Sequence, residues 1–305
     1  RRSSDLVYCK PNSDTITGLF QLDANLYSVE NFNEKGFVFA SFDGNQICLI
    51  PEKHSEKVSF GFDKKDIFFS EKEFNSPDET AKNKFETLVS EGIQAIKKEQ
   101  FKKVVLSRKE VVNLSDFDLG TVFEKLVQLY PTTFVYCFFH PKLGMWMGAT
   151  PEQLVQSQNK NIKTIALAGT KKSTGIEEVI WGNKEVIEQQ FVTDYIVKKL
   201  ENIANEVLVS KPYSIQAGSI WHIKTDISGV LNLDSNLQQV VCLLHPTPAV
   251  CGFPKENSKA FILENEKYDR SFYTGYLGEL NSGLVTDSDS SDLFVNLRCM
   301  QIEFG

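Results

Sequence analysis

The amino-acid sequence predicts an α+β fold: a single large domain with a layered, mostly antiparallel β-sandwich core and helices packed outside. Strand-like runs follow one another more often than the strict alternation of strand and helix in parallel sheets would give. The 305 residues are 41% hydrophobic and include 23 phenylalanines, which is enough apolar material for a large core. Two segments, residues 76–98 and 183–204, carry helical periodicity and supply helices for the outer layer.

Residues 1–75 are expected to form an N-terminal β-rich part of this domain. Short runs at residues 36–42, 46–50, 58–62 and 66–69 predict strands, and turn signals such as Asp43-Gly44 separate them.

A helix is expected next. Ser76-Pro77-Asp78-Glu79 reads as a capping box with proline at the first helical position. Apolar residues then recur at helical spacing, namely Ala81, Phe85, Leu88, Val89, Ile93 and Ile96.

The remaining elements follow from the same two periodicities. We expect strands at residues 103–112, 133–139, 145–149, 154–158, 162–168, 219–230 and 293–303. We expect helices at residues 119–129, 183–204, 237–244 and 255–265.

Composition excludes several classes of partner and site. The formal net charge is −7 and no long run of Lys or Arg occurs, so neither a nucleic-acid nor a membrane partner is expected. No apolar stretch reaches the length of about 18 residues that predicts a transmembrane helix. The 6 cysteines are scattered without a CxxC pair, and the 4 histidines lack metal-ligand spacing. We therefore expect a cytoplasmic protein with reduced thiols, as a monomer or weak homodimer.

The strand predicted at residues 103–112 carries a lysine among apolar residues. Because alternate side chains of a strand share a face, Lys103, Val105 and Ser107 are expected to point the same way. One interpretation is an edge-strand lysine in water, the commoner case for a lysine considered alone. The other is a lysine held in a pocket, where burial disfavours the ammonium form and lets the amine act as a base.

Two further segments combine small residues with polar ones. In Gly148-Ala149-Thr150-Pro151-Glu152, the proline fixes φ just before the glutamate. Glu152 is either solvated in a turn or held against apolar walls as a proton donor. Leu167-Ala168-Gly169-Thr170 is either a plain strand end or a set of N–H groups and a hydroxyl for a carboxylate.

The helix predicted at residues 183–204 carries a carboxylate on its apolar face. At about 100° per residue, Glu188 aligns with Val192 and Tyr195, and Glu185 lies one turn earlier at the edge of that face. A carboxylate that faces a core has to be paired, protonated or bound to a metal. A salt bridge to a lysine and a role as a Mg²⁺ ligand are both open.

Two more residues lie in unusual surroundings. His245 belongs to LLHPTPAVCG, a segment stiffened by two X-Pro bonds, and such irregular segments often line sites, although a lone histidine is more often structural. Arg298 lies in an apolar strand-like run and needs an anionic partner, either a protein carboxylate or a ligand carboxylate gripped by two hydrogen bonds.

Taken in order, KVVLSR, GATPE, LAGT, KEVIEQ, LLHPTPAVCG and YDRSFYTGYLGEL resemble the motifs of the chorismate-utilising enzymes over about residues 75–303. That family includes isochorismate, anthranilate, aminodeoxychorismate and salicylate synthases. The resemblance implies chorismate as the substrate, Mg²⁺ at the ring carboxylate of that substrate, and a catalytic core over residues 76–305.

The resemblance also implies roles for named residues. Lys103 is expected to activate a water that attacks C2 of chorismate, and Glu152 to protonate the departing C4 hydroxyl. Glu188 is expected to hold Mg²⁺, with Glu185 nearby. The residues expected to line the substrate pocket are Gly169, Thr170, His245, Ala249, Tyr273 and Arg298.

Within the family, the sequence most resembles isochorismate synthase. Lys103 stands where the water-adding members carry lysine and where anthranilate synthases usually carry glutamine. Ala168 stands where aminodeoxychorismate synthases usually carry lysine. Salicylate synthase and a non-catalytic chorismate-binding homologue are the alternatives, and the product could serve a menaquinone or a siderophore pathway.

The family pattern continues with a glycine-rich strand and an acidic helix, which supply further glutamates to the metal and a lysine to the substrate. This sequence ends at Gly305. We therefore expect the C-terminal motif to be missing and the metal site to be incomplete.

Overall fold

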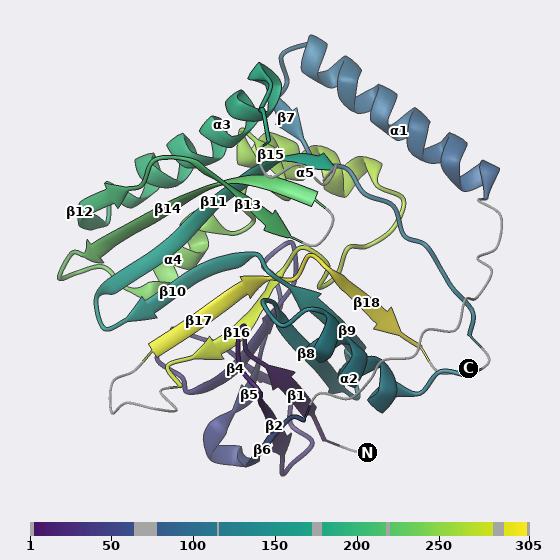
Figure 1. Ribbon diagram of the computed structural model, residues 1–305, viewed down its shortest axis with the longest axis vertical. Helices are drawn as coiled ribbons and strands as arrows, with labels where there is room; N and C mark the ends of the chain where they lie inside the picture. Colours follow the sequence, from purple (N-terminus) through teal and green to yellow (C-terminus); the bar gives the residue numbers. More distant parts are fainter. Residues whose placement is uncertain are drawn as a thin grey trace.

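The computed structural model describes residues 3–63, 78–114, 116–172, 179–217, 220–282 and 290–303. Two large sheets and five helices make up this described part (Figure 1). Every pair of neighbouring strands in the two sheets is antiparallel. The predicted α+β class is therefore confirmed.

The smaller sheet has six strands. In spatial order they are β18 (Cys299–Ile302), β9 (Gly144–Thr150), β8 (Phe134–His140), β1 (Asp5–Cys9), β2 (Thr15–Gln21) and β6 (Ser55–Gly61).

The larger sheet has ten strands. In spatial order they are β12 (Ala204–Val209), β14 (Ile220–Leu231), β11 (Asn161–Lys172), β10 (Gln153–Gln158), β17 (Ser290–Val295), β16 (Tyr276–Leu280), β4 (Gly36–Ala40), β5 (Ile47–Pro51) and β3 (Tyr27–Ser28), and β13 (Tyr213–Ala217) pairs with β14 beside this path.

The helices are α1 (Glu79–Lys97), α2 (Leu119–Leu129), α3 (Asn183–Leu200), α4 (Leu237–Leu244), α5 (Lys255–Asn265) and the short 3₁₀ helix η1 (Glu52–His54). α2 packs on β8 and β9, whereas α3 packs on β11 and β14 and contacts α4. Helices thus lie outside the sheets. No helix in the described ranges has the length and apolar character needed to cross a membrane.

Aromatic side chains fill the space between the two sheets. Tyr8 and Phe134 of the smaller sheet stack with ring centroids 5.4 Å apart. Phe39 of the larger sheet stacks on Phe272 at 4.3 Å. All four are buried, and aromatic pairs stabilise a core beyond the apolar area that they bury. The phenylalanine-rich composition therefore serves this inter-sheet layer.

Two predicted strands are interrupted. Of residues 103–112, only β7 (Lys103–Val104) is a strand, pairing with β15 (Gly252–Phe253), because the exposed Val111 and Val112 find no partner strand in the described part of the chain. The run at residues 293–303 breaks between β17 and β18, where buried Asn296 bonds to side chains and loop carbonyls. Arg298 therefore lies between strands rather than within one.

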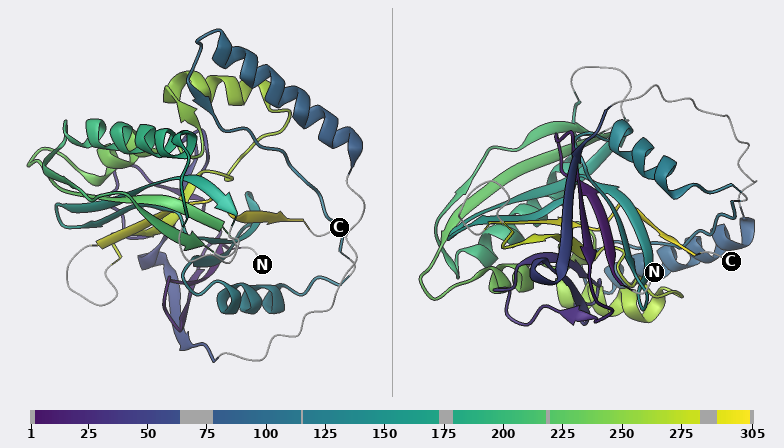
Figure 2. Two further views of the ribbon diagram at one scale, coloured as in Figure 1. Left: turned by 45° about the horizontal axis from the view of Figure 1, so that its top comes forward. Right: turned by 90° about the horizontal axis from the view of Figure 1, so that it is seen from below.

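The first helix also differs from its prediction. Its N-cap is Asp78, whose carboxylate accepts hydrogen bonds from the N–H groups of Thr80 and Ala81, so the helix begins at Glu79 rather than at proline. Ser76, Pro77 and the strand predicted at residues 66–69 lie outside the described residues. α1 lies at the periphery (Figure 2), and its predicted apolar face is partly exposed, with Ile93 at 47%.

Candidate active site

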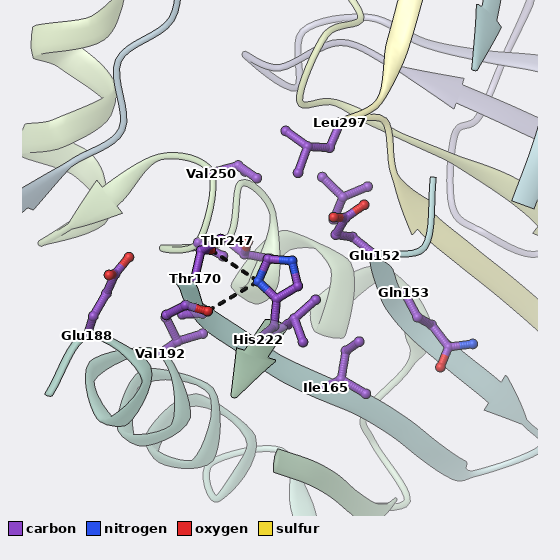
Figure 3. Close-up of a pocket in the computed structure, with 15 residues that line it drawn as sticks. Glu152, Gln153, Ile165, Thr170, Glu188, Val192, His222, Thr247, Val250 and Leu297 are labelled. Carbon is purple, nitrogen blue, oxygen red and sulfur yellow. Dashed lines mark hydrogen bonds between the residues drawn. The ribbon is translucent and has the colours of Figure 1, made fainter. Parts of the chain in front are cut away.

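The candidate site is a cavity in a fork of the ten-stranded sheet. β10 and β11 pair next to their connecting turn, where Gln156 faces Lys163, and the pairing stops there. Thr164 Oγ1 donates to the carbonyl of Leu154 at the base of the fork, at 2.7 Å. Beyond this point the strands separate, and a cavity of about 150 Å³ lies between them (Figure 3). Its lining comes from both strands, α3, β14 and residues 247–250.

A glycine lets β11 pass close to α3 at this cavity. Gly169 has φ +71° and lies at a register shift between β11 and β14. A Cβ atom there would lie 3.2 Å from the Cβ and the carbonyl oxygen of Glu185. The left-handed backbone favours glycine, and the close approach to Glu185 leaves little room for a side chain. Both features account for the Gly-Thr sequence at the end of the predicted strand.

One wall of the cavity carries Glu188, which pairs with a lysine on a separate strand. Glu188 lies on α3 beside buried Val192 and lines the cavity (Figure 3). Lys103 Nζ, on β7, lies 2.9 Å from Glu188 Oε1, and its side chain is 14% exposed. The lysine partner that the sequence left open for Glu188 is thus Lys103 itself. Two predicted functional residues from distant parts of the chain meet here.

The opposite wall carries the second predicted proton carrier. Figure 3 places Glu152 across the cavity from Glu188. Thr150 Oγ1 donates to Glu152 Oε2 at 2.9 Å, and Arg298 Nε lies 3.5 Å from Glu152 Oε1. The Arg298 side chain is 42% exposed, whereas that of Glu152 is 13% exposed. The guanidinium is therefore accessible to a ligand carboxylate from the solvent side.

Arg298 lines a second, larger cavity of about 480 Å³. Gly148, Ala149 and Pro151 of the predicted glutamate motif line it, together with α2 residues. The motif GATPE therefore separates two spaces, with Glu152 on one side and its small residues on the other.

His222 on β14 is a cavity residue that the sequence analysis did not single out. Burial lowers its pKa below the usual histidine value, which keeps the ring neutral at pH 7. Its Nδ1 lies 3.2 Å from the carbonyl of Gly169 and 3.1 Å from Thr170 Oγ1. Because a carbonyl only accepts, Nδ1 carries the proton, and Nε2 is a free acceptor without a partner among the described residues. The alternating pattern of β14 gave no sign of this, since it predicts an ordinary polar face.

The structure brings only some of the predicted pocket residues together. Gly169, Thr170 and Ala249 line the cavity. His245 does not, because its Nε2 contacts the carbonyl of Ser41 at 3.1 Å and its ring packs edge-on against Tyr276. Burial lowers the pKa of His245 to about 4, as for a neutral core histidine. Tyr273 also lies outside the lining, with its ring 5.6 Å from the Arg270 guanidinium.

The carboxylates available for a metal are limited. Glu185 accepts a hydrogen bond from Gly182 N–H at 3.1 Å and so caps its own helix. Within the described ranges no three His, Cys, Asp or Glu side chains converge. Mg²⁺ commonly binds through one or two protein carboxylates, with waters and substrate oxygens as its other ligands. Glu188, whose carboxylate lines the cavity opposite Glu152, fits that mode.

Comparison with known proteins now identifies the family. The family model described as chorismate binding enzyme matches residues 44–304. The chain belongs to the chorismate-binding enzymes. Isochorismate synthase EntC of Escherichia coli K12 is 29% identical over 231 residues, 72% of this chain and 57% of EntC. The chain thus spans little more than half of this curated relative.

Solved structures of chorismate-binding enzymes share the fold. The menaquinone-specific isochorismate synthase MenF from Escherichia coli matches with a TM-score of 0.74 and 18% identity, over 97% of this chain and 79% of that one. Anthranilate synthase component I from Streptococcus pneumoniae matches with a TM-score of 0.69 and 17% identity, over 98% and 84%. At these identities the likeness concerns the fold alone and does not show which reaction this chain catalyses.

Proposed function

We propose that this chorismate-binding enzyme is an isochorismate synthase, which adds water at C2 of chorismate and releases the C4 hydroxyl. The observation that carries the proposal is that Glu188 and Glu152 lie across one cavity from each other (Figure 3), and that Lys103 Nζ lies 2.9 Å from Glu188 Oε1. The reaction needs a base on one side of the substrate ring and an acid on the other. The name of the EntC relative supports the same choice.

The proposed chemistry balances without an external reductant or oxidant. Lys103 accepts a proton from water as the C2–O bond forms. The ring double bonds shift, the C4–O bond breaks, and Glu152 gives its proton to the leaving hydroxyl. His222 Nε2, the unpartnered acceptor, receives a hydrogen bond from a substrate hydroxyl or from the attacking water.

Two ion pairs have to change before this chemistry. Lys103 must leave its contact with Glu188 and be unprotonated before it can accept a proton from water. Mg²⁺ bound at Glu188 would supply the positive charge that compensates this carboxylate and the substrate's ring carboxylate. Glu152 must carry a proton, and its contact with Arg298 would pass to a substrate carboxylate.

Incubation with chorismate and Mg²⁺, followed by chromatography, tests the proposal. Accumulation of isochorismate is the expected result. Salicylate with pyruvate would identify a salicylate synthase instead. Chorismate binding without any product, measured by tryptophan fluorescence, would favour a non-catalytic homologue.

A further inference from the structure

The strand that carries Lys103 belongs to neither large sheet. In the described ranges, β7 pairs with β15 alone. Lys102 N–H donates to the carbonyl of Phe253 at 2.7 Å, and Val105 N–H donates to the carbonyl of Cys251 at 2.9 Å. On α5, Ser258 Oγ donates to the carbonyl of Lys103 at 2.8 Å. The position of Lys103 therefore depends on local contacts rather than on an extended ladder.

A buried guanidinium joins this strand to the segment that lines the cavity. Arg270 is 3% exposed, and all five of its N–H groups have acceptors. The acceptors are Glu266 Oε1 at 2.6 Å, Glu266 Oε2 at 2.7 Å, the Val105 carbonyl at 2.8 Å, Thr274 Oγ1 at 3.1 Å and the Val250 carbonyl at 3.2 Å. Val250 lines the cavity and Val105 lies two residues beyond Lys103. One side chain thus fixes the strand of Lys103 relative to a segment that lines the cavity.

Glu266 completes the network. Its Oε1 also accepts hydrogen bonds from the N–H of Ser107 at 2.8 Å and from Ser107 Oγ at 3.0 Å. Residues 103–107 are thereby held at their start by Ser258, in the middle by Arg270 and at their end by Glu266. The guanidinium also lies 4.5 Å from the ring of Phe42, which fixes its plane.

We infer that the Glu266–Arg270 pair is a positioning unit for Lys103, an inference that rests on the proposed function, in which Lys103 is the base. Packing alone does not require a buried ion pair, because apolar residues of similar volume often stabilise a core as well. Apolar residues cannot bind two carbonyls in fixed directions, whereas the planar fork of arginine does. Arg270 does not line the cavity itself, so it acts through Lys103.

Arg270→Lys is the first test. Lysine keeps the positive charge beside Glu266 but lacks the planar guanidinium that binds both carbonyls. We expect kcat to fall about tenfold or more while KM stays within about threefold, since a displaced base affects the transition state rather than substrate binding. Leu6→Ala is the matched control, because Leu6 is fully buried in the other sheet. At a temperature where both variants are folded, the control should keep the wild-type kcat. Equal kcat values in the two variants would overturn the inference.

Ser258→Ala removes the hydrogen bond to the Lys103 carbonyl and is the milder second variant. It should lower kcat in the same direction by about fivefold, the effect of one hydrogen bond. An unchanged kcat in Ser258→Ala, together with a strong loss in Arg270→Lys, would restrict the positioning unit to the ion pair named here.

A readout independent of turnover separates this inference from the proposed function. Limited acetylation with acetic anhydride, read by mass spectrometry, compares Lys103 with its exposed neighbour Lys102. Arg270→Lys should raise the Lys103 to Lys102 labelling ratio about threefold, because the strand opens locally. No rise overturns the inference. If the wild type makes no isochorismate, the proposed function fails alone, and the labelling ratio still decides the positioning role.

Discussion

Glu152 and Lys103, the two proposed proton carriers, are held in place in different ways. Glu152 lies next to β10, which is paired with β17 in the middle of a ten-stranded sheet. Lys103 lies on a two-residue strand outside both large sheets, held by side-chain hydrogen bonds. The proposed acid, Glu152, is thus fixed by a long ladder, and the proposed base, Lys103, by a local network. Substitutions in the Glu266–Arg270 network should therefore displace Lys103 while the sheet and Glu152 stay in place.

Lys103→Ala should give the largest effect. Loss of a general base lowers turnover by about 10²- to 10⁴-fold, and the fold should remain because Lys103 lies outside the sheets. Initial rates of isochorismate formation and near-UV circular dichroism check both parts. Lys102→Ala, at an exposed neighbouring position, is the matched control. Normal activity in Lys103→Ala would refute its role as the base.

Glu152→Gln should lower turnover by about 10²-fold, because the amide keeps the shape but cannot donate a proton as a carboxylic acid does. The thermal midpoint should change little, since Arg298 is 42% exposed and the amide oxygen of glutamine can still accept the hydrogen bond from Thr150 Oγ1. Glu110→Gln, which alters an exposed pair with Arg108, is the control. A fully active Glu152→Gln enzyme would show that Glu152 is not the general acid.

Glu188→Gln should raise the Mg²⁺ concentration for half-maximal activity by about tenfold or more, since an uncharged amide is a poorer ligand for a hard cation. Glu185→Gln should shift it by less than about twofold, because Glu185 caps α3 and an amide oxygen can still accept the Gly182 N–H. The comparison also tests the predicted ligand role of Glu185. Identical titrations for both variants and the wild type would exclude Glu188 as a ligand.

His245→Phe should give the smallest effect, seen in the pH dependence of stability. The folded pKa of His245 is about 4, below its usual value of 6.5, so the unfolded chain binds more protons between these values and stability falls as pH drops through this window. The full contribution is about 3 kcal/mol. Thermal midpoints at pH 7.5 and 5 should therefore differ less in His245→Phe than in the wild type. An unchanged difference would contradict a neutral buried histidine.

The sequence predicted the regular elements better than the cavity. The helices at residues 119–129, 237–244 and 255–265 have the predicted bounds because their apolar faces and ends are local signals. Glu188 was found from helical periodicity alone. The strands β1 and β2 were missed, since their burial depends on partners far along the chain.

The cavity residues were predicted unevenly for a physical reason. His245 was predicted to line the pocket because of its proline-rich segment, but its Nε2 contacts the carbonyl of Ser41. His222 sits in an ordinary alternating strand and faces the cavity because β10 and β11 separate there. Strand separation is a tertiary property that no local pattern encodes, and the same holds for the meeting of Lys103 with Glu188.

The fork between β10 and β11 has an evolutionary consequence. Residues on its two arms face an opening rather than a partner strand, so exchanging them alters the chemistry of the cavity without breaking the β10–β11 ladder. Anthranilate synthase component I has the same fold with 17% identity. When the cavity lies between two separated strands of the sheet, the residues that line it can change while the fold stays the same.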